Sequence, residues 1–403
     1  MFDGLIISLL LLSSVWVPQV ISQSTVPPNS VFVDPTTFAV LGANATFREN
    51  AFSADEFFNP TNSSPPFFQI FDASFIDVLG ESPAIYEVAS NSTFAFAHEA
   101  PIYVPETDEV FFASNAGGDL GMSDWDHNNV ISKISMTQVE AAIDAANASG
   151  SVNVPYTTFI LAETVQMANG GTGPYNGSLL VVTSGRAYSP PSIVLIDPYP
   201  PYDTTVLLDN FFGRQFNSLN DIKVHPLSRN MFFTDPAYGW LGHFRPLPLM
   251  PAQIYRFDPL TGSVRVVADG IGLPNGIAFS PNGSTCYIGD TSSQGGFLGV
   301  NQTLPSTIYA FDVDAETEAL KNRRVFAYVD TGIADGINVD TQGNVYASAG
   351  DGVHVWNNKG TLIGKIYLGT GSANLVFAGP GRLLVLSDTK ISLVRIAAEG
   401  MSL

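Results

Sequence analysis

Hydrophobic and polar positions alternate in short runs along most of the chain, and the same layout returns several times. Each unit begins with a side chain that carries an oxygen, continues as an alternating strand, turns through polar residues and ends in a second strand. Units begin at Asn220, Asn275 and Asp335 and end 15 positions later, and a similar unit begins at Glu99. Period-two alternation interrupted by polar turns predicts antiparallel hairpins.

Two further strands follow several of these hairpins. Third strands are predicted at 193–198, 254–259, 308–313 and 353–358, and a fourth strand such as 264–268 follows a turn. Units of four strands that start 55 and 60 residues apart are typical of propeller blades. A weaker unit near 177–183 and a hairpin at 374–388 bring the number to six. We therefore predict an all-β fold, a six-bladed β-propeller of four-stranded antiparallel blades.

The last predicted blade is one strand short, because the chain ends soon after the strand at 391–396. A strand from the N-terminal part, either 75–79 or 84–88, is expected to complete it and close the ring. The clearest helical pattern, residues 136–146, is predicted as a loop insertion.

The N-terminus predicts secretion. Residues 5–17 are almost wholly apolar, although the preceding segment holds Asp3 and no Lys or Arg, and the run is shorter than the ~18 residues that a membrane span needs. We predict a signal peptide at 1–22, an N-terminal extension at 23–66 and the propeller at 67–403. The protein is expected to be extracellular, with no membrane partner.

Composition agrees with an extracellular protein. Seven Asn-x-Ser/Thr sequences predict N-linked glycans: Asn44, Asn62, Asn91, Asn147, Asn176, Asn282 and Asn301. The single cysteine, Cys286, excludes an intrachain disulfide and is expected to be a small buried residue. A net charge of −20 without a basic cluster argues against a nucleic-acid partner.

The oxygen-bearing residues at the unit starts are the main candidates for chemistry. Inner strands of a propeller line its channel, so Glu99, Asn220, Asn275 and Asp335 are expected to meet near the axis. Carboxylate and amide oxygens without His or Cys favour a hard cation, Ca²⁺ before Mg²⁺. Asn-Gly and Asp-Gly are also common turn dipeptides, but four residues in one register favour a site. Asn374 is interpreted as sharing that register.

Neighbouring polar residues are assigned supporting roles. Asp235, Asp290 and Asp388, at strand ends, are predicted to form turns or to support the site. His98 is expected to orient Glu99, and His354 is expected to be structural. The sequence contains no Gly-x-Ser-x-Gly, His-Glu-x-x-His or Walker motif.

Together these motifs resemble the SMP-30/gluconolactonase family of six-bladed, calcium-dependent propellers, and within it the secreted lactonohydrolases of filamentous fungi. The resemblance covers about residues 67–396 and is carried by His-Glu99-Ala-Pro, Leu-Asn220-Asp, Pro-Asn275-Gly and Ala-Asp335-Gly. Stretches at 212–221, 244–246, 350–357 and 362–367 look like the fungal subgroup.

The resemblance implies that Glu99, Asn275 and Asp335 bind Ca²⁺ and that Asn220 is a ligand or a substrate contact. It also implies hydrolysis of small-molecule substrates, the lactones of sugar acids or of pantoyl type, with Asp335 as general base. A carboxylate bound to Ca²⁺ should have a pKa below ~3.9 and be a weak base. A water on the ion or Asp221 is therefore an alternative base.

Other functions stay open at this point. The same scaffold would suit a phosphotriesterase or another esterase, or a lyase that resembles strictosidine synthase. A non-catalytic, calcium-binding propeller that binds sugars or a protein is a further alternative, because fold does not decide function. Loops 116–129, 237–251 and 292–305 are expected to control which substrate fits.

Overall fold

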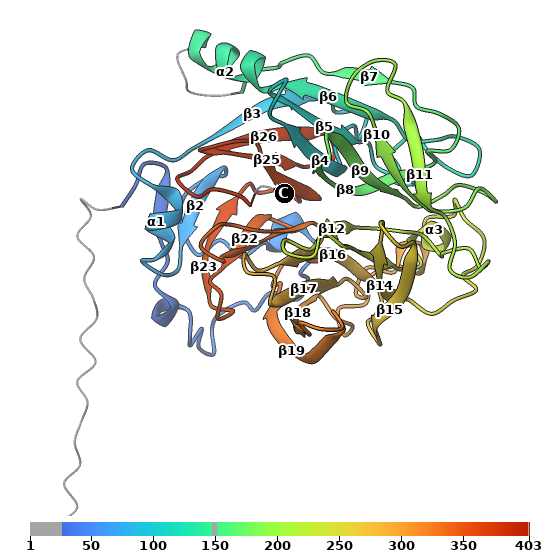
Figure 1. Ribbon diagram of the computed structural model, residues 1–403. Coiled ribbons are helices and arrows are strands. Elements are labelled where there is room, and N and C mark those ends of the chain that lie inside the picture. Colours follow the sequence, from blue (N-terminus) through green and yellow to red (C-terminus); the bar gives the residue numbers. More distant parts are fainter. Residues whose placement is uncertain (1–25, 147–150, 402) are drawn as a thin grey trace, which may run out of the picture.

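The computed structural model describes residues 26–146, 151–401 and 403 of the chain. Six β-sheets surround a central axis, as Figure 1 shows, and the predicted six-bladed propeller is confirmed. The predicted signal peptide, residues 1–22, lies outside the described residues. None of the helices that the structure describes has the length and apolar character that a membrane crossing requires.

Four blades consist of four consecutive antiparallel strands, with the first strand innermost. The first two blades contain β4 (Glu99–Val104), β5 (Glu109–Ala113), β6 (Ile131–Ser135) and β7 (Thr157–Phe159), then β8 (Ala168–Tyr175), β9 (Ser178–Thr183), β10 (Ser192–Ile196) and β11 (Thr204–Leu208). The next two contain β12 (Ile222–Val224), β13 (Met231–Asp235), β14 (Gln253–Asp258) and β15 (Ser263–Asp269), then β16 (Pro274–Phe279), β17 (Thr285–Asp290), β18 (Thr307–Val313) and β19 (Leu320–Tyr328).

Strands from the two ends of the propeller segment pair in the last blade and close the ring. That blade contains β24 (Asn374–Phe377), β25 (Arg382–Leu386) and β26 (Lys390–Arg395), and its outer strand is β3 (Ala84–Ser90), which precedes the first blade. The second of the two predicted closing strands is thus confirmed. The other prediction is wrong, because Phe75–Leu79 forms helix α1 and buries Phe75, Val78 and Leu79 at helical spacing.

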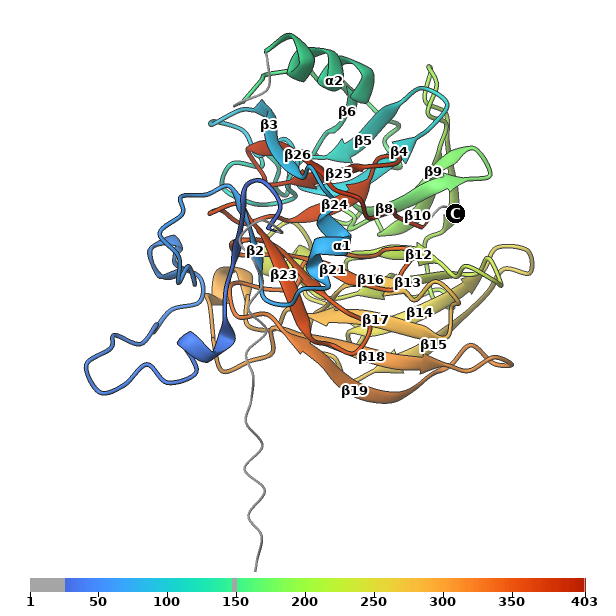
Figure 2. The same ribbon diagram turned by 90° about the vertical axis from the view of Figure 1, so that its left-hand side faces the viewer.

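The fifth blade extends beyond four strands. Its strands are β20 (Ile337–Val339), β21 (Val345–Ala349), β22 (Gly352–Trp356) and β23 (Leu362–Tyr367). Strand β2 (Phe67–Ile70) adds antiparallel to β23, and β1 (Ser30–Phe32) adds parallel to β2. Figure 2 shows this N-terminal part of the chain, in blue, beside the blade. Arg48 also binds the blade, since its Nη1 lies 2.9 Å from Asp330 Oδ2.

Helices are few and lie outside the sheets. Helix α2 (Met136–Ala145) confirms the predicted insertion: Ser135 caps it, and Met136, Val139 and Ile143 are buried. The remaining elements are the short helix α3 (Tyr238–Leu241) and three 3₁₀ turns, η2 (Pro35–Thr37), η3 (Ala54–Glu56) and η4 (Gly296–Leu298).

Hydrophobic packing fills the space between blades. Apolar residues from both faces of each sheet, such as Phe112 and Leu384 between the first and last blades, form clusters of fully buried side chains. Cys286 on β17 is buried in one such cluster and is free, as predicted. The blades are thus held by apolar burial, in addition to the hydrogen bonds within each sheet.

We predict that Gly364→Ala lowers the free energy of unfolding by about 1–3 kcal/mol, because the added methyl has no room. A Cβ on Gly364 in β23 would lie 2.1 Å from the ring of Phe75. Urea unfolding measures the loss. Gly371→Ala is the matched control, since its Cβ would meet nothing closer than 3.6 Å. Equal losses in the two variants would contradict this account of the packing of α1.

Candidate metal centre

The four predicted site residues lie at the starts of four inner strands. Glu99 is the first residue of β4 and Asn275 the second of β16, while Asn220 and Asp335 stand two residues before β12 and β20. Glu99, Asn220 and Asn275 are each 4% exposed, and Asp335 is half-buried. The starts of the inner strands thus place polar side chains in the protein interior, where each needs a hydrogen-bond partner.

Strand pairing shows that three of the four share one register. Ile222, Ile277 and Ile337 each pair with the second strand of their blade, and the site residue lies two positions earlier in each case. The glycines that follow Asn275 and Asp335 do not form hairpin turns. A Cβ on Gly276 would lie 2.2 Å from the carbonyl oxygen of Asp335, so glycine lets neighbouring inner strands approach.

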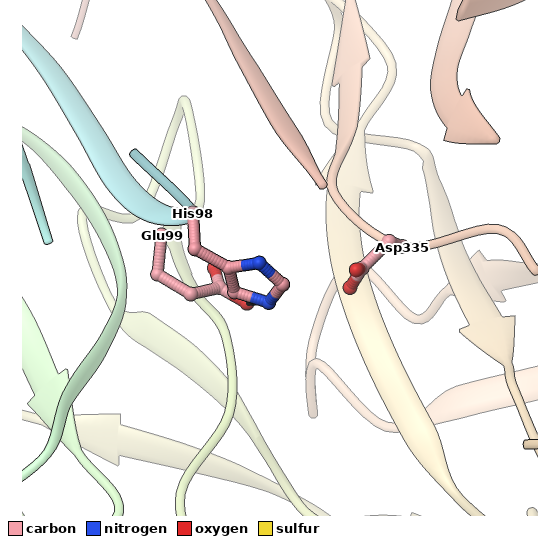
Figure 3. A group of neighbouring side chains, drawn as sticks. All are labelled: His98, Glu99 and Asp335. Atoms are coloured by element: carbon pink, nitrogen blue, oxygen red, sulfur yellow. Dashed lines mark ion pairs between the residues drawn. The ribbon is translucent and has the colours of Figure 1, made fainter. Parts of the chain in front are cut away.

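Two carboxylates and an imidazole meet at the centre of the site. Ligand atoms of His98, Glu99 and Asp335 lie within 4.8 Å of one another. In Figure 3, His98 and Glu99 extend from one strand and Asp335 faces them from the other side. His98 Nε2 is 3.7 Å from Glu99 Oε1, which agrees with the predicted orienting role. The side-chain amide of Asn275 opposes the rise in the pKa of the Asp335 carboxyl.

Burial and neighbouring charges shift the pKa values of the three side chains in this cluster. Burial, together with the charge of Asp335, raises the pKa of Glu99 to about 8, and burial raises the pKa of Asp335 to about 6. Burial alone would lower the pKa of His98, but the charge and hydrogen bond of Asp388 outweigh it and raise that pKa to about 10. A bound cation would stabilise the charged forms of the Glu99 and Asp335 carboxyls together.

Asp388 and Asn115 hold His98 in place. His98 Nδ1 lies 2.8 Å from Asp388 Oδ1, and Asn115 Nδ2 donates to the same oxygen at 2.9 Å. The pKa of the Asp388 carboxyl is lowered by His98 despite burial. Asp388 therefore supports the site, as predicted, by fixing the imidazole so that Nε2 faces Glu99.

Asn374 has a different place from the one predicted. The backbone N–H of Gly336 donates to the carbonyl of Ala373, just as Gly170 donates to Asn220, so Ala373 occupies the shared register. Asn374 follows it and donates through Nδ2 to Glu99 Oε2 at 2.9 Å. The sequence alone did not separate these adjacent positions, because the inter-strand hydrogen bonds that distinguish them form only in the closed ring.

Asp221 is a brace between inner strands. Its Oδ1 accepts from the backbone N–H of Ile222 at 2.8 Å and its Oδ2 accepts from that of Ile277 at 3.0 Å. Both oxygens of the buried carboxylate are thus engaged by fixed donors. This arrangement argues against Asp221 as a mobile proton acceptor and links β12 to β16.

Asp235 and Asp290 stabilise the segments that lead into Asn220 and Asn275. Asp235 accepts from the backbone N–H groups of Asn217 and Ser218, at 3.0 and 2.8 Å. Asp290 accepts from the N–H of Leu273 at 3.2 Å. Both aspartates therefore have the supporting role that was predicted for them.

Asn169 is a further candidate for the site, which the sequence pattern did not single out. Asn169 lies between the paired positions Ala168–Thr183 and Gly171–Val181. Asn275 lies at the same place between the first two paired positions of its own blade. It is 7% exposed, its Nδ2 donates to Ser184 Oγ at 3.2 Å, and within the described chain its Oδ1 has no hydrogen-bond partner. The Asn169-Gly170 dipeptide in front of the weak second unit was the signal that could have found it.

A second acidic group lies in the fifth blade, where Asp330, Asp351 and His354 approach one another. Lys365 already occupies the space between them, since its buried Nζ lies 2.7 Å from Asp330 Oδ1 and 2.9 Å from Asp351 Oδ2. His354 is 1% exposed and bonds Asp351, so its predicted structural role agrees with its position. This group is a charge network that needs no metal ion.

The donors at the propeller axis do fit a hard cation. Glu99, Asn275 and Asp335 offer only oxygens, with no sulfur, and a lysine or arginine side chain forms no ion pair with Glu99 or Asp335 within the described residues. Oxygen donors of mixed charge suit Ca²⁺ or Mg²⁺. Burial raises the pKa values of the two carboxylates, and a bound cation would offset this by stabilising their charged forms.

Known proteins resemble this chain along most of its length. Lactonohydrolase oryH of Aspergillus oryzae is 27% identical over 399 residues, with 81% of this chain and 80% of that protein covered. Lactonohydrolase oryL of the same species is 29% identical, with 79% and 73% covered. These two proteins are named as lactone hydrolases.

A solved structure also has this architecture. The gluconolactonase XC5397 from Xanthomonas campestris superposes with a TM-score of 0.60 at 23% identity, covering 84% of this chain and 96% of that one, which shows a shared fold. The sequence pattern described as the SMP-30/Gluconolactonase/LRE-like region matches residues 99–389, from the first inner strand into the last blade. The chain therefore belongs to the SMP-30/gluconolactonase/LRE-like family.

Proposed function

We propose that this protein is a secreted, calcium-dependent lactonase that hydrolyses aldonate or pantoyl-type lactones to hydroxy acids. The observation that carries the proposal is the convergence of the oxygens of Glu99 and Asp335, with the amide of Asn275, at the axis of the propeller. The names of the fungal and bacterial relatives support lactone hydrolysis.

Glu99, Asn220, Asn275 and Asp335 would hold the cation. When bound, Ca²⁺ would supply a Lewis acid that polarises the lactone carbonyl and offsets the charge that develops on its oxygen. Asn374 and His98 keep Glu99 in place, so its carboxylate is fixed before any ligand arrives. Such preorganisation lowers the cost of assembling the site.

Asn220 and Asp335 would act on the substrate. The side-chain amide of Asn220 makes no hydrogen bond within the part of the chain that the structure describes, so it is free to contact a lactone oxygen. Asp335, which is half-buried, would accept a proton from the attacking water. The water oxygen then bonds to the carbonyl carbon, the ring C–O bond breaks, and the alkoxide takes up the proton to give the hydroxy acid.

Secretion is proposed from the apolar run at residues 5–17 and from the glycosylation sequences. Asn282 is the clearest of these positions. It is exposed in the turn between β16 and β17, and its Oδ1 accepts from Ser284 N at 3.1 Å, which leaves the amide nitrogen for a glycan.

Lactone turnover is predicted to depend on Ca²⁺. Gluconolactone, galactonolactone, pantoyl lactone and dihydrocoumarin are offered in turn, and acid release is followed at constant pH. Chelation with EDTA should abolish hydrolysis, because the carbonyl would lose its Lewis acid, and added Ca²⁺ should restore it. Protein that holds Ca²⁺ but turns over no lactone would instead support a binding propeller or an esterase for other substrates.

Asp335→Ala and Asn275→Ala are each expected to abolish both Ca²⁺ binding and turnover, because each removes an oxygen donor from the centre. Calorimetric titration and the acid-release assay measure the two effects. Asn338→Ala is the control, since this amide lies on β20 and donates only to the carbonyl of Leu375 at 3.2 Å. Wild-type binding and turnover in either site variant would contradict the proposed metal centre.

Removal of Ca²⁺ is expected to lower the melting temperature. An ion that binds the native state alone stabilises it by about 2.7 kcal/mol at a concentration 100 times its Kd. The carboxylates of Glu99 and Asp335 would otherwise repel each other. Differential scanning calorimetry of EDTA-treated and reloaded protein measures the shift. An unchanged melting temperature, with metal removal verified, would argue against a tightly held ion.

A further inference from the structure

The loops on the metal side of the propeller are long in four blades and short in two. The end of a second strand lies beside the start of its inner strand, as the pair Glu99–Ala113 shows, so the loops that follow second strands stand on the metal side. In the first four blades these loops span residues 114–130, 184–191, 236–252 and 291–306. In the fifth blade and the last blade they span only 350–351 and 387–389.

The four longer loops contact one another and form one continuous body, which we name the loop wall. The carbonyl oxygen of the buried Phe244, in the third blade, accepts from the backbone N–H of Ala187 in the second at 2.8 Å. A Cβ on Gly117 of the first blade would lie 2.6 Å from the ring of Phe244. A Cβ on Gly296 of the fourth blade would lie 2.5 Å from the carbonyl oxygen of Leu241. The third-blade loop thus touches the other three.

The loop wall borders the candidate metal centre at both ends. In the first blade, Asn115 Nδ2 donates at 2.9 Å to Asp388 Oδ1, the oxygen that also holds the imidazole at the centre. In the fourth blade, Thr291 Oγ1 donates at 3.0 Å to the carbonyl oxygen of Leu273, two residues before Asn275. A substrate at the centre would therefore have the loop wall beside it.

Arg245 joins the loop wall to the segment beneath it. The residue is only 5% exposed. Its guanidinium donates to the carbonyl oxygens of Ala187, at 3.4 Å, and Ser189 in the second-blade loop. It also donates at 3.2 Å to the carbonyl oxygen of Asn217, in the segment that leads to Asn220. A planar guanidinium offers five N–H donors in a fixed geometry, so this one side chain can hold three segments together.

The surrounding chain makes room for this guanidinium and satisfies its donors. A Cβ on Gly239 would lie 2.4 Å from Arg245 Cγ, and a Cβ on Gly185 would lie 2.9 Å from Nη1. Nη2 donates to Gln215 Oε1 at 3.2 Å and to the carbonyl oxygen of Phe216 at 3.4 Å. Because all three of its nitrogens bond fixed acceptors of the protein, Arg245 is suited to holding segments together and not to binding an external anion.

We propose that Arg245 is a positioning residue that fixes the loop wall and so determines which lactones fit at the candidate metal centre. The inference rests on the proposed lactonase function. A wall held in one position excludes a bulky substituent from the side of the first four blades. A wall released from Arg245 would move, and bulky lactones would gain turnover relative to small ones. Selectivity is the ratio of their kcat/KM values.

Two lactones that share one ring test the proposal: gluconolactone, and maltobionolactone, which carries an added glucosyl group. Arg245→Lys keeps the charge but loses the planar fork. We expect the ratio of kcat/KM for gluconolactone to that for maltobionolactone to fall about threefold to tenfold, as for one lost hydrogen bond. Backbone hydrogen exchange of residues 184–191 and 236–252 should become faster in the same variant, because Arg245 no longer holds these loops.

A second variant and a matched control accompany Arg245→Lys. Phe244→Leu weakens the contact with Gly117 and leaves the arginine in place, so it should shift the ratio in the same direction. Arg256→Lys is the control, since Arg256 lies in β14 of the same blade and its Nε is 2.6 Å from Glu318 Oε2, in the turn between β18 and β19. This ion pair lies outside the loop wall, so its change should leave the ratio at the wild-type value.

A wild-type ratio in both Arg245→Lys and Phe244→Leu would overturn the proposal. So would an equal loss of turnover on the two lactones, or an equal shift of the ratio in Arg256→Lys. Each of these results would leave lactone hydrolysis itself standing. Wild-type protein that hydrolyses neither lactone would contradict the proposed function, and this inference with it.

Discussion

The propeller ring is closed by a pair of strands that lie far apart in the chain. Strand β3, which precedes the first blade, pairs with β26 of the last, and so removes the free edge that an open set of sheets would expose. Closure also forces all six inner strands to begin near one axis. Polar residues at those beginnings, Glu99 and Asp335 among them, are then buried together whatever their separation in the chain.

Burial at the axis divides the polar groups into two kinds. The carboxylate of Asp221 and the amide of Asn374 find partners within the protein and act as braces between strands. The carboxylates of Glu99 and Asp335 have raised pKa values, because burial disfavours their charged forms. The first kind stabilises the ring without help. The carboxylates of the second kind are the ones that a cation would stabilise.

Equivalent positions have taken different roles because their neighbours differ. Asp235 and Asp290 end the second strands of their blades and accept from backbone N–H groups just before Asn220 and Asn275. Asp388 follows the second strand of the last blade, but it faces His98 and fixes the imidazole instead. One structural repeat thus supplies both the backbone support and the side-chain support of a single site.

The amino-acid sequence predicts the six blades, the α2 insertion and four candidate site positions, because strand alternation and turn residues are local signals that a repeat amplifies. It did not separate Ala373 from Asn374, did not reveal Asn169, and left two candidates for the closing strand. These points became clear from the folded ring. Register and pairing depend on contacts across the ring, such as Asn374 with Glu99, between residues 275 positions apart, which no local pattern encodes.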